Sequence, residues 1–463
     1  MKRLVDHVAT RSGTDRVFVD DRLELKGGSL IEVVERTRAE HSVFRGSSVG
    51  VCFSRGYETA LALVALDGFA EQLLIVPPTS KPARVREFID RTDTEFILGN
   101  RENLRTGGLR QYDIRNLCGL NGGLTQKEDD GNAGDRGTVC DTEWILATSG
   151  TTGTPKLVAH DLSSLLRTVK TDTKVGHTLR WGLLYDLCRF AGIQVFLQSL
   201  VGGSTLIFAD HVESIDEQVN LLLSGNCNAL SGTPTMWRRL LMSDQFENLS
   251  LRIATLGGEI ADGQILKALQ RTFPEAKISH IYASTEAGVG FSVSDGQPGF
   301  PATFLENPPE ETEIKVSDEG LLHLRPPQPE QERYVEEGLT LTDGEGWINT
   351  GDVVERSGDR FLFQGRESGV INVGGNKVHP EKVENVIQEV EGVAQVVVRA
   401  KKSAITGNLV EALVKPSGNV EGEQELRSAV RERCNADLNN YEVPAVCKVV
   451  SSLEMNAAGK LVR

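Results

Sequence analysis

The feature that most constrains the fold is an alternation of short apolar runs with helix-like segments through the first 290 residues. Residues 48–53 predict a strand, 56–67 a helix and 73–76 the next strand. A helix over 81–91 and a strand over 94–98 continue the series. Strands that alternate with helices indicate parallel sheets covered by helices, because a parallel connection needs a long crossover. The fold class expected is therefore α/β.

The same alternation returns at 205–208, 252–256 and 277–282. A chain of 463 residues exceeds the size at which one hydrophobic core keeps growing, so at least two domains are expected. The first is a large N-terminal domain of layered sheets and helices. Within it, residues 106–137 are rich in Gly, Asn and Asp and predict a loop or linker.

The pattern changes beyond about residue 290. Short extended pieces at 313–316, 321–324 and 361–363 are separated by Gly, Asp and Pro turns. Such pieces predict a small antiparallel β subdomain over about 290–364.

A compact α+β unit is predicted after Arg366. Its helices are expected over 380–391 and 423–435, and its strands over 394–400 and 409–414.

Composition excludes several classes of function. The formal net charge of −15 argues against nucleic acid or an anionic membrane as the main partner. The seven cysteines form no CxxC pair, which favours reduced thiols in a cytoplasmic protein over a metal cluster. The N-terminus lacks the apolar core of a signal peptide, and no apolar run is long enough to span a membrane. A cytoplasmic location is expected.

A glycine-rich loop follows the apolar run 144–147. It reads Thr148-Ser149-Gly150-Thr151-Thr152-Gly153-Thr154-Pro155-Lys156. Glycines allow close approach of the backbone to a phosphate, hydroxyls add donors, and the lysine adds charge. The Walker loop requires Gly immediately before Lys, where this chain has Pro155. A plain linker is the alternative for such a segment taken alone.

The order of these nine residues resembles the phosphate-loop signature of the AMP-forming adenylating enzymes. This superfamily includes acyl-CoA synthetases, peptide-synthetase adenylation domains and luciferase. Further resemblances follow in order at 282–286, 349–352, 365–384 and 459–460. Several ordered motifs are a far more specific signal than any one of them.

The resemblance implies a large N-terminal domain, residues 1–365, and a mobile C-terminal lid, residues 366–463. It implies ATP-dependent activation of a small carboxylic acid as an acyl-adenylate, with Mg²⁺ as cofactor and pyrophosphate as product. The acyl group then passes to a thiol, with coenzyme A as the first choice. The alternatives are a carrier-protein phosphopantetheine, a nitrogen nucleophile, or a nucleotide-binding regulatory protein without catalysis.

The resemblance also assigns roles after the strand ending near Tyr282. Tyr282 would stack on adenine beside Ala283, Thr285 would contact the α-phosphate, and Glu286 would bind magnesium. Magnesium prefers hard oxygen ligands and takes one or two carboxylates together with phosphate oxygens. The alternative is a Thr-Glu pair that caps a helix.

Two further segments complete the implied nucleotide site. Gly257-Gly258-Glu259 would let adenine or the acyl chain pack against bare backbone, and an ordinary strand-to-helix turn is the alternative. Asp352 would accept hydrogen bonds from both ribose hydroxyls, which suits a bidentate acceptor. Arg366 would add a second ribose or phosphate contact.

Lys460 matches the catalytic lysine of the family and would bridge the substrate carboxylate and the α-phosphate. A solvated tail lysine is the alternative, since only three residues follow. The presence of Lys156, Glu286, Asp352 and Lys460 together argues against a mere binder. Delivery of Lys460 implies that the lid closes for adenylation and rotates for thiol transfer.

The substrate segment gives the weakest signal. Tyr185 and Phe190 suit an apolar wall of the acyl pocket. Asp186 could pair a substrate amine; the alternative is that it caps a helix or pairs within the protein. Arg189 could bind a second substrate carboxylate. His160 is predicted to be structural. The identity of the acid, and the choice between monomer and homodimer, stay open at this stage.

Overall fold

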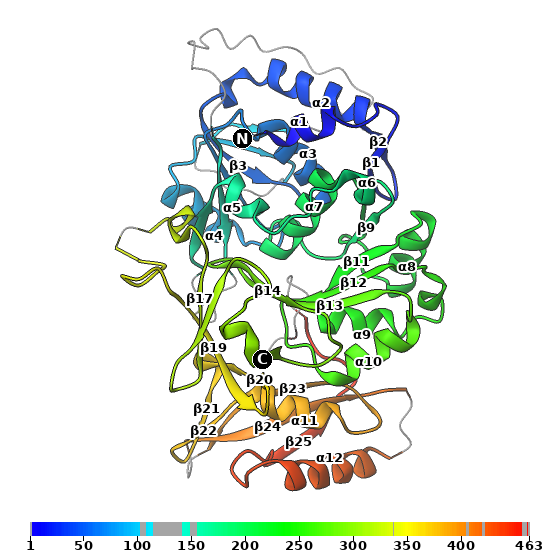
Figure 1. The fold of residues 1–463 in the computed structure, drawn as a ribbon, viewed down its shortest axis with the longest axis vertical. Helices are drawn as coiled ribbons and strands as arrows, with labels where there is room; N and C mark the ends of the chain where they lie inside the picture. Colours follow the sequence, from blue (N-terminus) through cyan, green and yellow to red (C-terminus); the bar gives the residue numbers. More distant parts are fainter. Residues whose placement is uncertain are drawn as a thin grey trace.

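The structure is a computed structural model of the 463-residue chain. It describes residues 2–101, 108–113, 141–148, 155–336, 338–403, 407–418, 422–455 and 461. In these residues the chain forms layered sheets and helices in its N-terminal part and a smaller α+β unit at its C-terminal end (Figure 1). The expected α/β class is confirmed.

The first sheet has eight strands in the order β14-β13-β12-β11-β9-β10-β1-β2. In chain order these are β1 (Arg16–Val19), β2 (Glu24–Lys26), β9 (Arg180–Leu183), β10 (Thr205–Phe208), β11 (Ala229–Gly232), β12 (Ile253–Gly257), β13 (Lys277–Ser284) and β14 (Gly288–Val293). Neighbouring strands are parallel except at the two edges, where β2 and β14 run antiparallel. The sheet thus combines β1 and β2 with strands that begin more than 150 residues later.

The second sheet has seven strands in the order β18-β8-β7-β4-β3-β5-β6. These are β3 (Ser48–Cys52), β4 (Gln72–Ile75), β5 (Phe96–Gly99), β6 (Gln111–Tyr112), β7 (Glu143–Ala147), β8 (Leu157–His160) and β18 (Glu332–Tyr334). The prediction of a loop throughout 106–137 is wrong at β6, which pairs with β5. Tyr112 packs edge-on against Phe44 and Phe96, so its side chain is held as well as its backbone.

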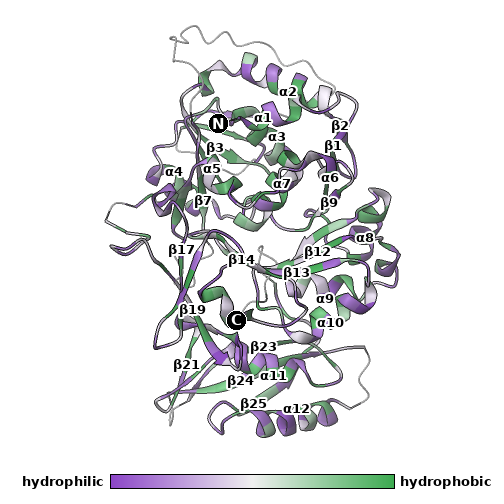
Figure 2. Cartoon of the chain, in the orientation of Figure 1, coloured by the Kyte–Doolittle hydropathy of each residue, from purple (hydrophilic) through white to green (hydrophobic). Residues whose placement is uncertain are grey.

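Helices cover these sheets, and one of them is buried along its whole length. They are α1 (Leu4–Ala9), α2 (Gly27–Glu40), α3 (Gly56–Leu66), α4 (Pro82–Arg91), α5 (Leu162–Leu166), α6 (Thr173–Gly176), α7 (Phe190–Gly202), α8 (Ile215–Ser224), α9 (Pro234–Leu240) and α10 (Gly263–Thr272). Every residue of α3 is buried, and beyond Thr59 the helix consists of Ala, Leu and Val alone (Figure 2). Such a helix must have protein on all sides.

The third sheet is antiparallel, in the order β15-β20-β19-β17-β16. Its strands are β15 (Phe300–Pro301), β16 (Glu313–Val316), β17 (Leu321–Arg325), β19 (Ile348–Ser357) and β20 (Arg360–Arg366). The expected antiparallel subdomain is present, but one segment departs from it. Strand β18 leaves this region and pairs with β8 of the second sheet. Glu332 is buried there and forms an ion pair with Arg167 at 3.0 Å.

The C-terminal unit has its own hydrophobic core, which includes Val383, Ile387 and Val430. It contains β21 (Ile371–Val373), β22 (Asn376–Val378), α11 (Pro380–Gln388), β23 (Val393–Ser403), β24 (Gly407–Pro416), α12 (Glu423–Asp437) and β25 (Val446–Val449). Helix α11 ends before the predicted residue 391, ahead of Gly392 at φ +88°. Among the residues that the structure describes, every helix is too short or too polar to cross a bilayer.

Candidate functional site

A cavity of about 820 Å³ lies where the carboxyl ends of β9, β11, β12 and β13 meet the third sheet and the segment after β20. Parallel strands present their carboxyl ends at one edge, which is where α/β folds bind ligands. The predicted site residues that line the cavity are Thr148, Lys156, Tyr185, Asp186, Arg189, Phe190, Gly257, Gly258, Ala283, Thr285, Glu286 and Arg366. The fold therefore brings residues from opposite halves of the chain to one cavity.

The two ends of the glycine-rich loop are held together at the cavity. Thr148 donates its backbone N–H to the Lys156 carbonyl at 2.9 Å, and Lys156 N–H donates to Thr148 Oγ1 at 3.2 Å. These bonds continue the antiparallel ladder between β7 and β8. Ser149, Gly150, Thr151, Thr152 and Gly153 lie outside the described residues. The phosphate role of this loop stays a prediction.

The Lys156 ammonium group faces Tyr334 of β18. Its Nζ lies 4.5 Å from the centre of the phenol ring and 3.4 Å from the hydroxyl. Burial, reinforced by the nearby Glu286, raises the pKa of Tyr334 to about 12, so the phenol stays neutral at pH 7. Tyr334 also lines the cavity. It was missed from the sequence because the pairing of β18 with β8 has no local signature.

Tyr282 and Asp352 form a hydrogen-bonded pair between the first and third sheets. The Tyr282 hydroxyl donates to Asp352 Oδ2 at 2.5 Å. Burial and the adjacent carboxylate raise the pKa of Tyr282 well above its usual value, which keeps the donor protonated. The ring stacks against Phe291 and Phe363, each with its centre 5.1 Å away. Tyr282 is not among the described residues that line the cavity, and its adenine contact stays a prediction.

Asp352 also faces Arg366 across the β19–β20 ladder, where the two residues are paired. Arg366 Nε lies 3.6 Å from Asp352 Oδ1, and Arg366 Nη2 donates to the Thr350 carbonyl at 2.9 Å. Gly351 has φ +70°, and a Cβ there would come within 3.2 Å of Arg366 Nη2. A glycine is thus needed for the turn and for the close approach of the arginine.

In the Gly257-Gly258-Glu259 segment the two glycines face the cavity, whereas the glutamate bonds to a neighbouring helix. The Gly257 carbonyl accepts a hydrogen bond from the Tyr185 hydroxyl at 3.3 Å, and Gly258 has φ +83°. Both glycines line the cavity. The Glu259 carboxylate instead accepts the Thr235 N–H at 2.9 Å, in the first turn of α9. The alternative of a strand-to-helix turn describes Glu259, whose contact with a nucleotide stays a prediction.

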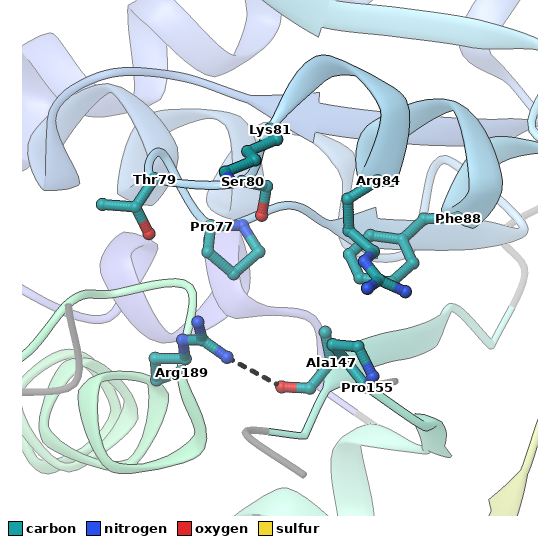
Figure 3. A pocket seen from close by; sticks show the side chains of 9 residues that line it. All are labelled: Pro77, Thr79, Ser80, Lys81, Arg84, Phe88, Ala147, Pro155 and Arg189. Atoms are coloured by element: carbon teal, nitrogen blue, oxygen red, sulfur yellow. Dashed lines mark hydrogen bonds between the residues drawn. The ribbon is translucent and has the colours of Figure 1, made fainter. Parts of the chain in front are cut away.

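Asp186 and Arg189 already have partners within the protein. Asp186 Oδ1 accepts the Cys188 N–H at 2.9 Å, and Oδ2 lies 3.7 Å from Arg189 Nε. Burial raises the pKa of Asp186 against the opposing effect of these neighbours. Arg189 Nη1 donates to the Ala147 carbonyl at 3.3 Å, on the wall of a smaller pocket of about 200 Å³ (Figure 3). These contacts match the local-pairing alternative, and contacts of either side chain with substrate stay predictions.

Tyr185 and Phe190 are both buried side chains of the cavity wall. The Phe190 ring lies 5.9 Å from the ring of buried His160, which has the structural surroundings expected of it. Burial lowers the pKa of His160 to about 4, so the imidazole is neutral at pH 7. The acyl-wall role of Tyr185 and Phe190 stays a prediction.

Thr285 and Glu286 follow the end of β13 and face the cavity. Within the described ranges, no three His, Cys, Asp or Glu side chains gather as a ready-made metal site. A lone carboxylate suits magnesium when phosphate oxygens complete the ligand set. The role of Glu286 stays a prediction. Lys460 lies outside the described residues.

Comparisons with known proteins agree with this arrangement. Residues 38–332 match the AMP-binding enzyme family, and residues 382–460 match the AMP-binding enzyme C-terminal domain. The 2-succinylbenzoate–CoA ligase of Listeria monocytogenes serotype 4b is 26% identical over 334 residues, covering 69% of this chain and 68% of that protein. The D-alanine–D-alanyl carrier protein ligase of Bacillus cytotoxicus is 25% identical, covering 69% of each.

Two solved structures show the same fold. The o-succinylbenzoate CoA synthetase of Bacillus subtilis, in complex with its acyl-adenylate intermediate, has a TM-score of 0.75 at 18% identity. That alignment covers 100% of this chain and 97% of the other. ATP-bound MatB from Rhodopseudomonas palustris has a TM-score of 0.79 at 17% identity, covering 99% and 97%.

Proposed function

Because the chain belongs to the AMP-binding enzyme family, we propose that it is an ATP-dependent acid–thiol ligase. In the first step a carboxylate oxygen attacks the α-phosphorus of ATP, the bond to the bridging oxygen breaks, and pyrophosphate leaves. In the second step a thiol sulfur attacks the acyl carbon, the bond to AMP breaks, and the thiol proton is released. The ordered motifs and the family match indicate the same class of enzyme.

The observation that carries this proposal is the shared cavity. Lys156, Thr285 and Glu286 lie on the same cavity as Tyr185 and Phe190. A carboxylate and a triphosphate repel each other, so a site that joins them must neutralise charge and fix their geometry. Magnesium held by Glu286 and phosphate oxygens would supply neutralisation. Lys460 would stabilise charge at the α-phosphorus.

The proposed ribose subsite centres on Asp352, whose chain neighbour Gly351 and ladder partner Arg366 line the cavity. Asp352 is held by the Tyr282 hydroxyl on one oxygen and faces Arg366 on the other. A carboxylate fixed in this way loses little freedom when it accepts two ribose hydroxyls. We assign Asp352 to the ribose on this ground.

Coenzyme A is the acceptor we favour, and a carrier-protein phosphopantetheine is the second candidate. The listerial relative is named as a CoA ligase and the Bacillus cytotoxicus relative as a carrier protein ligase, which supports a thiol in both cases. We place the boundary between an N-terminal domain and a mobile lid after Gly365. Arg366, Glu367 and Ser368 line the cavity, so a rotation there would change its wall. A cytoplasmic location is part of the proposal.

The test is ATP–pyrophosphate exchange across fatty, aryl and amino acids, followed by thioester formation with coenzyme A or phosphopantetheine. Acid-dependent exchange and an acyl-CoA product are expected. Exchange with no acid, despite measured ATP binding, would support the regulatory alternative. Exchange followed by transfer to an amine alone would contradict the thiol acceptor.

A further inference from the structure

The floor of the cavity carries a band of hydroxyl groups that adenylation does not require. Ser231, Thr255 and Ser279 stand opposite one another on β11, β12 and β13, and all three line the cavity. Parallel strands covered on both faces are usually apolar throughout. Three hydroxyls at one level of the sheet therefore make this part of the acyl region polar.

A second polar group lies one level deeper, toward the amino ends of the strands. Trp181 of β9 is level with Lys277 of β13 through the intervening strands. Trp181 lines the cavity and is 6% exposed. In the described part of the chain its buried indole N–H has no hydrogen-bond acceptor. A buried donor without a partner costs free energy that an acceptor on a bound molecule would recover.

Two ammonium groups also border the cavity, and that of Lys277 belongs to the residue level with Trp181. Lys170 and Lys277 both line it and are exposed. Gln198 of α7 fixes the Lys170 backbone, accepting its N–H at 2.9 Å and donating to its carbonyl at 3.1 Å. Glu310 also lines the cavity, and its carboxylate accepts a hydrogen bond from the Ser292 hydroxyl. Ser292 stands opposite Ile281 on β13, four residues along that strand from Lys277.

The walls between these polar groups are apolar. They are formed by Val169, Val175, Leu179 and Val195. A ligand here would be apolar along its middle and would meet a donor, Trp181, and a cation, Lys277, at its end. A plain hydrocarbon tail would leave the Trp181 N–H without an acceptor.

We infer, on the basis of the proposed function, that the acid is elongated and carries a hydrogen-bond-accepting oxygen at the end remote from the activated carboxylate. Trp181 lies within β9 and Tyr185 two residues beyond its carboxyl end, so the two are separated by at most about 13 Å at ~3.3 Å per residue. The acceptor and the reacting carboxylate are then separated by on the order of 10 Å. A carbonyl, a hydroxyl and a second carboxylate share this chemistry.

The test compares acids of one length in ATP–pyrophosphate exchange: octanoate, 7-oxooctanoate, 8-hydroxyoctanoate and octanedioate. At least one oxygenated acid is expected to exceed octanoate about tenfold in kcat/KM, the scale of one hydrogen bond in a buried site. Trp181→Phe keeps an aromatic ring and removes the donor, so it should reduce this preference to within about twofold. The urea midpoint of each protein is the control for folding, and the preference is taken as the ratio of kcat/KM for the oxygenated acid to that for octanoate in the same protein.

Lys277→Gln, at an exposed position, gives a second test that does not depend on a core substitution. If Lys277→Gln lowers kcat/KM for octanedioate alone, the distal group of the acid is a second carboxylate. If the preference for an oxygenated acid over octanoate is the same before and after the change, the distal group is a neutral oxygen that accepts from Trp181. Octanoate as the best of the four acids, or a proportional loss with all acids in Trp181→Phe, would overturn the inference while adenylation stands. No exchange with any acid, including the wider panel, would overturn the proposed function and this inference with it.

Discussion

Replacement of Tyr282 by Phe tests whether this residue acts through its ring or through its hydroxyl. The change keeps the stacking on Phe291 and Phe363 and removes the donor to Asp352. A hydrogen bond to a charged group contributes about 1.5–3 kcal/mol. Asp352 keeps 20% of its side-chain exposure and faces Arg366 at 3.6 Å, so water and the guanidinium offset part of the loss.

The lower end of that range, about 1.5 kcal/mol, corresponds to roughly a tenfold weaker affinity for ATP. The assay is calorimetric titration with ATP and with 2′,3′-dideoxy-ATP, which lacks both ribose hydroxyls. We expect the tenfold loss for ATP and less than about a twofold change for the dideoxy nucleotide, because only ATP uses the Asp352 carboxylate.

Tyr334→Phe is the matched control, since its hydroxyl is near Lys156 and not bonded to Asp352. It should affect the two nucleotides equally. An unchanged affinity of Tyr282→Phe for ATP would refute the positioning role of the hydroxyl. Equal losses with both nucleotides would show that the hydroxyl acts outside the ribose subsite.

Three further predictions follow from the site and its supports. Lys460→Ala should lower adenylate formation by at least about 100-fold while thiol transfer from supplied adenylate continues, because the cation acts on the phosphoryl step; equal loss in both half-reactions would contradict the assignment. Burial depresses the pKa of His160 from 6.5 to about 4, so only the unfolded chain takes up a proton between these values. The contribution of neutral His160 to the free energy of unfolding is therefore fully present above pH 6.5, and it should fall by about 3 kcal/mol toward pH 4 in urea titrations. A His160→Gln variant with the same pH dependence would exclude this origin. A Cβ at Gly192 would meet the Asp186 carbonyl and approach Leu187 Cα at 2.7 Å. Gly192→Ala should cost about 1–3 kcal/mol in urea and lower kcat/KM, whereas Gly263→Ala, with open space around it, should do neither; equal effects would refute the packing argument.

Local signals in the sequence were sufficient for many elements. Strands β10 and β16 have the predicted limits, because each is a short apolar or alternating run bounded by turn-forming residues. Helix α12 begins at the predicted Glu423 and extends two residues farther, to Asp437. The errors at β6 and β18 share a cause: both are short edge strands whose conformation depends on a distant partner.

The candidate site was predictable to the extent that its residues occur in ordered motifs. Thr148, Lys156, Thr285, Glu286 and Arg366 were chosen from the sequence and meet at one cavity. Tyr334 and Trp181 carry no motif, and their positions follow from strand pairing. The Tyr282–Asp352 bond likewise joins two motifs that the sequence had assigned separate tasks.

The sequence by itself determined the alternation of elements, the family and the order of the motifs, because these depend on residue type and spacing along the chain. Only the tertiary structure decided which groups face one another across the cavity and which are already engaged. Glu259 shows the difference, since its carboxylate accepts from the N–H of Thr235, which lies 24 residues away along the chain. Hydrogen bonds and burial depend on neighbours in space, and β9, β13 and β19 come together only when the sheets assemble.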